Sequence, residues 1–467
     1  MTSPATRALF SSDALLPTGW ARDVLLQWNA QGGLEAVTPG AACPPGIPRA
    51  GGPLVPGMPN LHSHAFQRAF AGLTEYRGAA HDSFWSWRTL MYRFANALTP
   101  QQLEAIATGL YVEMLEAGYT SVCEFHYIHH GIDGQPYADD ATLSQALLRA
   151  AARAGIGLTL LPVLYQTAGF GGLPPNEGQR RFIRSTDNML ALLERLAPLC
   201  AAQDARLGLA PHSLRAVPPD SLREAIAGLH ALDAQAPVHI HIAEQTGEVE
   251  ACLAWSGQRP VQWLLDHAPV DARWCLVHAT HMTPDEYQRA ARTGAVAGLC
   301  PTTEANLGDG LFDTQAWLAA GGRWGIGSDS HATVNAAEEL LMLEYGQRLM
   351  TRQRNLLANA GQASVATAMT LEAVAGGAQA SARRIGGLAA GQQADWVVLA
   401  ASDPLLQGLP GAEAMLSAHV FASHRRSAIG EVWVAGRPLV QAGRHALHDE
   451  ALSALSQARQ QLLTDAP

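Results

Sequence analysis

Two histidines separated by a single residue are the strongest chemical signal in this sequence. Residues 58–64 read Met-Pro-Asn-Leu-His-Ser-His, so that His62 and His64 end a short apolar run. If that run is a β-strand, side chains two residues apart point to the same side. One strand end can then offer two imidazole nitrogens to one metal ion.

Three later apolar runs also end in residues that can bind a metal or transfer a proton. One run ends at His241 and Glu244, the next at His278 and the last at Asp329. Any one of them is weak evidence, because a lone histidine in an apolar run is usually a hydrogen-bonded core residue. An aspartate in Gly-Ser-Asp-Ser is usually a turn or cap residue. Four such runs in one chain, however, indicate a hydrolytic metal site.

The chemical types of these residues suit zinc. Neutral imidazoles and a carboxylate are good zinc ligands, and catalytic zinc sites keep one position for water. We therefore expect His62, His64, His241 and Asp329 to hold one Zn²⁺, although another divalent metal could take its place. Binding to zinc lowers the pKa of water from ~16 to ~7, so that hydroxide is available at neutral pH.

Glu244 and the other histidines are open to two interpretations each. His278 ends the strand that follows that of His241, and it is either a further ligand or a base and electrostatic partner for the water. Glu244 either shuttles a proton from the water to a leaving group or is a helix N-terminal carboxylate favoured by the helix dipole. Three more histidines are assigned supporting or loop positions: His239, His281 and His331.

The elements that must position these residues alternate along the middle of the chain. Near-continuous apolar runs are typical of parallel strands buried on both faces, and residues 101–117 and 220–232 have the pattern of amphipathic helices. We expect eight strands, which begin near Leu54, Tyr119, Ile156, Leu207, Val238, Trp274, Val296 and Trp324. This order predicts an α/β fold, a (β/α)8 TIM-like barrel with its site at the C-terminal strand ends. A doubly wound sheet is the alternative, but the converging polar strand ends favour a closed barrel.

Both ends of the chain have a different pattern. The first part contains short β-like pieces with much Gly and Pro, and residues 431–440 carry a β-hairpin signal. A last helix is expected near residues 457–463. We therefore expect residues 1–53 and 385–467 to form one small, discontinuous β-sandwich domain with a C-terminal helix. Residues 54–384 would be inserted between them as the metal-dependent catalytic barrel.

The composition excludes several classes of protein. The 467 residues are 48% hydrophobic and carry a net charge of −10 without blocks of like charge, which argues against a nucleic-acid partner. The chain contains no run of about 18 apolar residues, so no membrane span is predicted. The first 20 residues lack the pattern of an export signal. The six cysteines form no CxxC pair and several lie in apolar runs, which indicates buried free thiols in the cytoplasm.

Taken together, the motifs resemble those of the amidohydrolase superfamily, in its mononuclear deaminase branch. The resemblance is carried by His-x-His, His-Ile-Ala-Glu, the later His and Ser-Asp-Ser, and by residues 300–310. No strand-four lysine that could bridge two metals is evident. Most members of the branch carry Ser-Asn where this chain has Thr303-Glu304. That branch includes deaminases of guanine, cytosine and adenosine derivatives.

A narrower resemblance, over nearly the whole chain, is to the family of formimidoylglutamate deiminases. It rests on residues 60–68, 82–88, 124–130, 212–217 and 303–306. The resemblance implies that a metal-activated water attacks the formimidoyl carbon of N-formimidoyl-L-glutamate and that ammonia leaves N-formyl-L-glutamate, in histidine degradation. It implies catalytic roles for Glu244, His278 and Asp329, and substrate binding by Gln67, Arg88, Tyr127, His212 and Arg215.

The two arginines have independent physical support. The implied substrate is a small dicarboxylate, which a net charge of −10 would repel at long range. Guanidinium groups bind carboxylates in a bidentate manner. Arg88 lies in the long segment after the first strand, among Trp85 and Trp87, and Arg215 lies just past the fourth strand. A nucleobase deaminase would instead need stacking groups and amides, and a non-catalytic scaffold should lack the ligands. We expect a homodimer in the cytoplasm.

Overall fold

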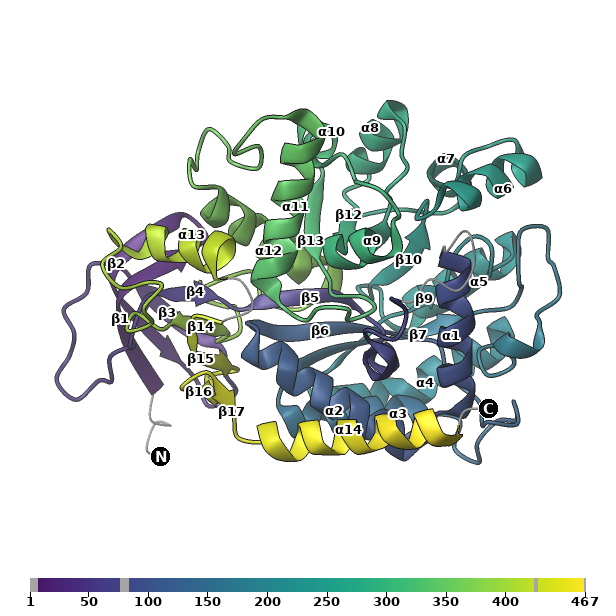
Figure 1. Cartoon of the computed structure of the whole chain (residues 1–467), viewed down its shortest axis with the longest axis horizontal. Coiled ribbons are helices and arrows are strands. Elements are labelled where there is room, and N and C mark those ends of the chain that lie inside the picture. The colour runs from purple at the N-terminus through teal and green to yellow at the C-terminus, as the bar shows by residue number, and fades with distance from the viewer. Residues whose placement is uncertain (1–6, 76–83, 424–426, 466–467) are drawn as a thin grey trace.

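A long row of parallel strands, wrapped by helices, forms the larger part of the molecule (Figure 1). The computed structural model describes residues 7–75, 84–423 and 427–465, so Asp82 and Ser83 lie outside the described residues. The parallel strands are β5 (Met58–Ser63), β6 (Tyr119–His126), β7 (Gly157–Leu164), β8 (Arg206–Leu207), β9 (Ala210–Pro211), β10 (Val238–Ile242), β11 (Trp274–His278), β12 (Val296–Leu299) and β13 (Arg323–Ile326). The arrangement is TIM-barrel-like, with β8 and β9 sharing the place of the fourth strand.

Hydrogen bonds join these strands in two parallel groups. One sheet has the order β5-β6-β7-β8, with β9 paired to β7, and the other has the order β10-β11-β12-β13. Parallel bridges between Leu209 and Val238, and between Ser63 and Asp329, link the two groups at both edges. Every residue of β5, β6, β7, β10 and β11 is buried, as expected of strands that helices cover.

The covering helices follow the strands in sequence. They are α1 (Phe84–Ala97), α2 (Pro100–Glu116), α3 (Thr142–Ala154), α4 (Thr186–Ala202), α5 (Pro219–Leu232), α6 (Thr246–Ser256), α7 (Pro260–His267), α8 (Pro284–Arg292), α9 (Pro301–Leu307), α10 (Thr314–Ala319), α11 (Ala336–Thr351) and α12 (Val365–Ser381). Two short 3-10 turns, η1 (Ala65–Phe70) and η2 (Glu177–Gln179), lie in the loops. The helices predicted at 101–117 and 220–232 correspond closely to α2 and α5.

A separate sheet is built from both ends of the chain. Its strands are β1 (Arg7–Leu16), β2 (Gly19–Trp28), β3 (Leu34–Thr38), β4 (Leu54–Pro56), β14 (Trp396–Leu399), β15 (Ile429–Val434), β16 (Arg437–Gln441) and β17 (Arg444–His445). They form one eight-stranded sheet in the order β17-β16-β15-β14-β4-β1-β2-β3. The packing of two facing layers that a sandwich requires stays a prediction, as do the predicted domain boundaries.

The first barrel strand begins later than the sequence pattern suggested. The apolar run that starts at Leu54 is divided at Gly57: β4 pairs with β1 and β14, whereas β5 pairs with β6. A side chain at position 57 would collide with Thr120. Glycine is therefore required where the chain passes from one sheet to the other.

The last helix, α14 (His448–Asp465), leaves the small sheet and lies along α2 and α3 (Figure 1). It is longer than the predicted segment 457–463. The imidazole of His448 bonds to Glu116 at 2.8 Å, and the Arg459 guanidinium donates to the carbonyls of Ala69 and Arg68 at 2.9 and 3.0 Å. The remaining helix, α13 (Ala412–Ala422), connects β14 to β15. Within the described ranges, no helix has both the length and the apolar character needed to cross a bilayer.

Candidate metal centre and active site

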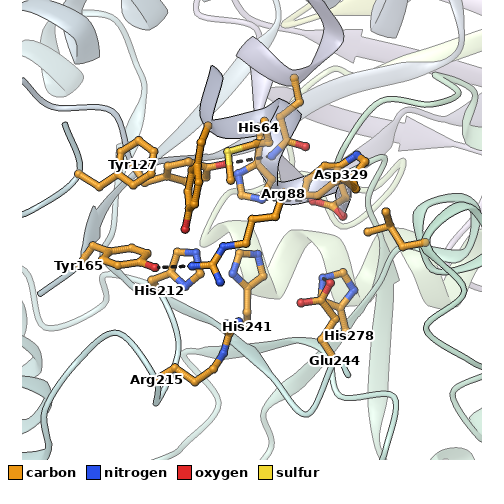
Figure 2. Close-up of a pocket in the computed structure, with 16 residues that line it drawn as sticks. His64, Arg88, Tyr127, Tyr165, His212, Arg215, His241, Glu244, His278 and Asp329 are labelled. Carbon is orange, nitrogen blue, oxygen red and sulfur yellow. Dashed lines mark hydrogen bonds and ion pairs between the residues drawn. The ribbon is translucent and has the colours of Figure 1, made fainter. Parts of the chain in front are cut away.

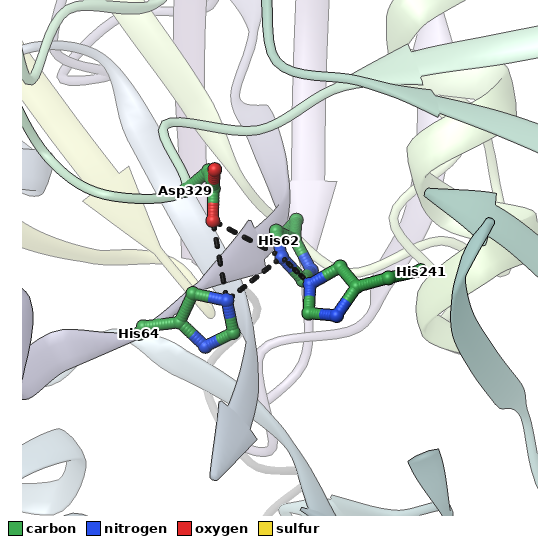
Figure 3. Close-up of side chains that lie close together, drawn as sticks. All are labelled: His62, His64, His241 and Asp329. Atoms are coloured by element: carbon green, nitrogen blue, oxygen red, sulfur yellow. Dashed lines mark hydrogen bonds and ion pairs between the residues drawn. The ribbon is translucent and has the colours of Figure 1, made fainter. Parts of the chain in front are cut away.

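Four side chains converge at the C-terminal ends of three strands (Figure 3). His62 lies in β5 and His64 follows it, His241 lies in β10, and Asp329 follows β13. The Nε2 atom of His62 is 3.1 Å from that of His64 and 3.0 Å from that of His241. Asp329 Oδ1 lies 3.2 Å from the Nε2 atoms of both His62 and His64. The structure thus brings together all four residues that the sequence predicted as ligands.

The donor set fits one divalent metal ion. Tetrahedral zinc with Zn–N distances near 2.05 Å requires donor atoms about 3.3 Å apart, close to the distances found here. All four side chains are buried, and their ligand atoms lie within 4.8 Å of one another. The Nδ1 atom of His64 bonds to the carbonyl of Phe125 at 2.8 Å, which directs its Nε2 atom toward the cluster.

The charge states of these residues also suit a metal. Burial lowers the pKa of His62 to about 3, so that its ring is neutral, as a ligand must be. Although burial would raise the pKa of Asp329, the adjacent imidazoles of His62 and His64 hold it well below its ordinary value. All 31 cationic residues of the chain are arginines. The chain therefore has no lysine that could be carboxylated to bridge a second metal.

The backbone turns sharply where these strands end. His278 has a φ of 65°, Asp329 a φ of 44°, and Ala243, between His241 and Glu244, a φ of 50°. Such left-handed conformations are uncommon for residues other than glycine, and they cluster at functional sites. Here they direct polar side chains away from the regular alternation of the strands and into one pocket.

Glu244 and His278 lie side by side next to the metal centre (Figure 2). His278 Nε2 is 4.0 Å from Glu244 Oε1, and His278 Nδ1 is 3.3 Å from Glu304 Oε1. Burial alone would lower the pKa of His278, but the carboxylates of Glu244, Glu304 and Asp329 raise it to about 10. Burial raises the pKa of Glu244, which favours a carboxyl group that can accept and return a proton.

The pocket above the four ligands has a volume of about 550 Å³ and extends to both predicted arginines. Arg88 of α1 donates to the hydroxyl of Tyr165 at 3.1 Å, and its guanidinium lies 5.0 Å from the ring centre of Tyr92. Arg215 follows β9, and its buried Nε atom has no hydrogen-bond partner among the described residues. Burial would lower the pKa of Arg215, but Glu248, Tyr165 and Glu244 together with Tyr92 outweigh that effect and raise it. Both cations face the pocket in Figure 2.

The other three predicted substrate-binding residues also line this pocket: Gln67, Tyr127 and His212. Gln67 Nε2 donates to the Tyr127 hydroxyl at 2.9 Å, whereas the buried Gln67 Oε1 has no partner among the described residues. Burial, reinforced by Arg215 and Arg88, lowers the pKa of His212 well below its ordinary value. A neutral imidazole and a free amide oxygen are thus available to a ligand.

The three histidines assigned to supporting or loop positions bond to protein atoms. His239 Nε2 is 2.8 Å from the carbonyl of Ala380, and His281 Nε2 is 2.9 Å from that of Asp309. His331 is fully enclosed, 3.0 and 3.1 Å from the hydroxyls of Ser328 and Ser63. It therefore connects the two segments that carry His64 and Asp329.

Several pocket residues were not predicted as site residues: Trp87, Met91, Tyr92, Tyr165, Phe182 and Leu307. Trp87 is named in the sequence analysis only as a neighbour of Arg88, and the side chain of Trp85 lies outside the described part of the chain. Tyr92 follows Arg88 by four residues, so helical spacing could have identified it. Phe182 lies in a loop with no local signal. The contact of Glu304 with His278 was also missed.

Comparison with known proteins agrees with this geometry. The model of the amidohydrolase family matches residues 54–439, and that of the formimidoylglutamate deiminase HutF N-terminal domain matches residues 6–50. Formimidoylglutamate deiminase of Pseudomonas aeruginosa is 54% identical over 98% of this chain and 99% of its own length. The chain belongs to the formimidoylglutamate deiminase family of amidohydrolases.

Other known proteins resemble the chain in sequence or in fold. A 5-methylthioadenosine/S-adenosylhomocysteine deaminase of Nitratidesulfovibrio vulgaris is 29% identical over 90% of this chain and 87% of its own length. The crystal structure of an amidohydrolase from Brucella melitensis superposes with a TM-score of 0.92, at 48% identity, over 98% of this chain and 100% of that one. An adenosine deaminase from Xanthomonas campestris, with bound zinc, has a TM-score of 0.81 at 21% identity over 99% of both chains. That last likeness is one of fold alone.

Proposed function

We propose that this chain hydrolyses N-formimidoyl-L-glutamate to N-formyl-L-glutamate and ammonia, as a step of histidine degradation. The observation that carries the proposal is the 54% identity to formimidoylglutamate deiminase, which spans 98% of this chain. The pocket supports it, because two arginines and a candidate metal centre lie on the same cavity. A small diacid with a hydrolysable carbon–nitrogen bond matches that combination.

His62, His64, His241 and Asp329 would hold one Zn²⁺ or a similar ion. When bound, such an ion supplies a water molecule that ionises near neutral pH. With four protein donors, the water would be a fifth ligand, and catalytic zinc can expand from four ligands to five. The single-ion stoichiometry is supported by the absence of lysine from the sequence.

Glu244 is assigned the proton transfers. Hydrolysis forms one carbon–oxygen bond at the formimidoyl carbon and breaks its bond to the terminal nitrogen, which must gain protons to leave as ammonia. Glu244 accepts a proton from the attacking water and delivers it to that nitrogen, for which its raised pKa is suited. His278, 4.0 Å away, supports this exchange electrostatically, and Asp329 assists as a nearby acceptor.

The glutamate part of the substrate is assigned to the arginine end of the pocket. Arg88 and Arg215 would each bind one carboxylate, because guanidinium groups pair with carboxylates through two parallel hydrogen bonds. Gln67, Tyr127 and His212 line the same cavity and offer neutral polar groups. A nucleobase, as in the deaminase rival, carries no carboxylate that either arginine could bind.

Three finer features belong to the same proposal. The bridges Leu209–Val238 and Ser63–Asp329 support closure of the two parallel sheets into one eight-stranded barrel. The unpaired state of all six cysteines suits a reducing compartment such as the cytoplasm. Assembly as a homodimer stays a prediction.

A substrate screen tests the activity. Ammonia release is measured with N-formimidoyl-L-glutamate, N-formimidoylglycine, guanine, cytosine and S-adenosylhomocysteine. We expect turnover of the first and at least a hundredfold lower kcat/KM for N-formimidoylglycine, because loss of one charged hydrogen-bonded pair costs about 2–5 kcal/mol. Equal activity on both formimidoyl compounds would refute the diacid pocket, and preferential activity on a base would favour the rival deaminase.

A further inference from the structure

His278 lies between two buried carboxylates that come from different strand ends. Its Nε2 atom faces Glu244 Oε1 at 4.0 Å, and its Nδ1 atom faces Glu304 Oε1 at 3.3 Å. The exposed fractions of His278 and Glu304 are 1% and 5%. A carboxylate so deeply buried is costly unless a charged or hydrogen-bonding partner meets it. His278 is that partner, so the two side chains constrain each other.

The backbone of His278 does not fix the direction of its ring. A regular strand residue points its side chain in a direction set by the sheet, but His278 is the last residue of β11 and has a φ of 65°. The following residue, Ala279, is also left-handed, with a φ of 48°. The orientation of the imidazole therefore depends on what its nitrogen atoms contact.

A purely structural role for Glu304 is the simpler alternative. Glu304 lies in the first turn of α9, and its Oε1 atom also accepts from the backbone nitrogen of Cys300 at 2.9 Å. A second buried carboxylate, Glu339 of α11, already serves the start of this helix: it accepts from Thr302 N at 3.0 Å and Thr302 Oγ1 at 2.5 Å. Contact with His278 distinguishes Glu304 from this second carboxylate.

We propose that Glu304 is a positioning residue, whose carboxylate accepts the Nδ1 hydrogen of His278 and thereby directs Nε2 toward Glu244 and the substrate. The hydrogen bond made by one imidazole nitrogen determines which nitrogen carries the proton and how the ring is turned. The inference rests on the proposed deiminase reaction and extends it by one residue. Through Glu304, α9 is connected to the proton-transfer pair of β10 and β11.

Kinetics of two matched variants test this role. Glu304→Leu removes the acceptor for both Cys300 and His278, whereas Glu339→Leu removes a carboxylate that caps the same helix without contacting His278. Partners behind functional side chains typically contribute about 10–100-fold. We expect Glu304→Leu to lower kcat by that factor with KM nearly unchanged, Glu304→Gln to restore most of it, and Glu339→Leu to affect stability alone. A kcat for Glu304→Leu within twofold of the Glu339→Leu value would overturn the proposal.

A spectroscopic measurement separates positioning from stability and needs no turnover. In the metal-loaded protein with ¹⁵N-labelled histidine, the His278 signals are those that disappear in His278→Asn. We expect the Nδ1–H signal of His278 to be that of a hydrogen-bonded group. This signal should change in Glu304→Leu, or in Glu304→Gln if the leucine variant does not fold. It should persist in Glu339→Leu. An Nδ1 signal insensitive to residue 304 would contradict the inference. An inactive parent enzyme with a sensitive signal would instead contradict the proposed reaction alone.

Discussion

At the scale of residues, Glu244 and His278 form a buried pair, and each of them also lies near other ionisable side chains. Glu244 is near Arg215 and Glu248 as well as His278, and its backbone nitrogen donates to Glu248 Oε2 at 3.1 Å. Because both members are buried, each senses the charge of the other strongly. Such a pair is suited to exchange protons during a reaction. Its side chains are polar, so they are not main contributors to the hydrophobic core.

We therefore expect Glu244→Gln and His278→Asn to affect chemistry rather than folding. General acid–base groups typically contribute about 10²–10⁴-fold in rate, so kcat should fall at least a hundredfold. Asparagine is chosen at position 278 because it tolerates the left-handed backbone found there. Ammonia release, metal content and thermal melting are compared with those of His281→Asn, a histidine outside the pocket lining. A kcat within a few-fold of the parent value would remove the variant residue from the mechanism.

At the scale of elements, α14 connects the C-terminal part of the chain to the candidate active site. Its Arg459 donates to the carbonyls of Arg68 and Ala69 at the end of η1, the 3-10 turn that follows His64 and carries Gln67. Arg68 in turn donates to Glu113 of α2 at 2.8 Å. The position of Gln67 thus depends on a helix that is remote in sequence.

Replacing Arg459 by methionine should loosen this turn while leaving the candidate metal ligands intact. Hydrogen bonds that involve a charged group contribute about 1.5–3 kcal/mol. We expect the free energy of unfolding in urea to fall by about that amount and KM for N-formimidoyl-L-glutamate to rise. The control is Arg153→Met, which removes an exposed pair with Glu450 of the same helix and should cost no more than about 1 kcal/mol. Equal behaviour of the two variants would show that Arg459 does not support η1.

The features that could be predicted from the sequence were those encoded by residues close together in the chain. The ligand set follows from spacing within short runs, as with His62 and His64, and the strands follow from apolar runs. Two contacts could not be predicted in this way, because no sequence periodicity relates residues so far apart. Glu304 is 26 residues from His278, and Arg459 is 390 residues from Ala69. The division of the first strand was missed because the reason for Gly57 is the remote side chain of Thr120.

At the scale of the whole molecule, the candidate metal centre joins strands from both groups of parallel strands. His62, His241 and Asp329 belong to or follow β5, β10 and β13. A ligand that binds only the folded chain stabilises it, by about 4 kcal/mol at a thousandfold excess over its Kd. An ion held there should therefore act as a crosslink between distant segments.

Metal analysis and calorimetry test this expectation. We expect about one equivalent of divalent metal per chain, a lower melting temperature after chelation, and recovery when zinc is added. His241→Asn should abolish the recovery, whereas His281→Asn should not. A reproducible content of two ions, or a melting temperature that chelation leaves unchanged, would contradict a single structural and catalytic centre.

The sheet formed by both chain ends imposes an order on biosynthesis. The β1–β2 hairpin pairs locally and can form early, but β4 pairs along Leu54–Pro56 with Trp396–Val398 of β14. At about 5–20 residues per second, a ribosome needs tens of seconds to reach those partners. During that interval β4 has an open edge of the kind that recruits other strands. The late strands therefore do more than complete a domain: β14 covers an edge that is otherwise open to pairing with other chains.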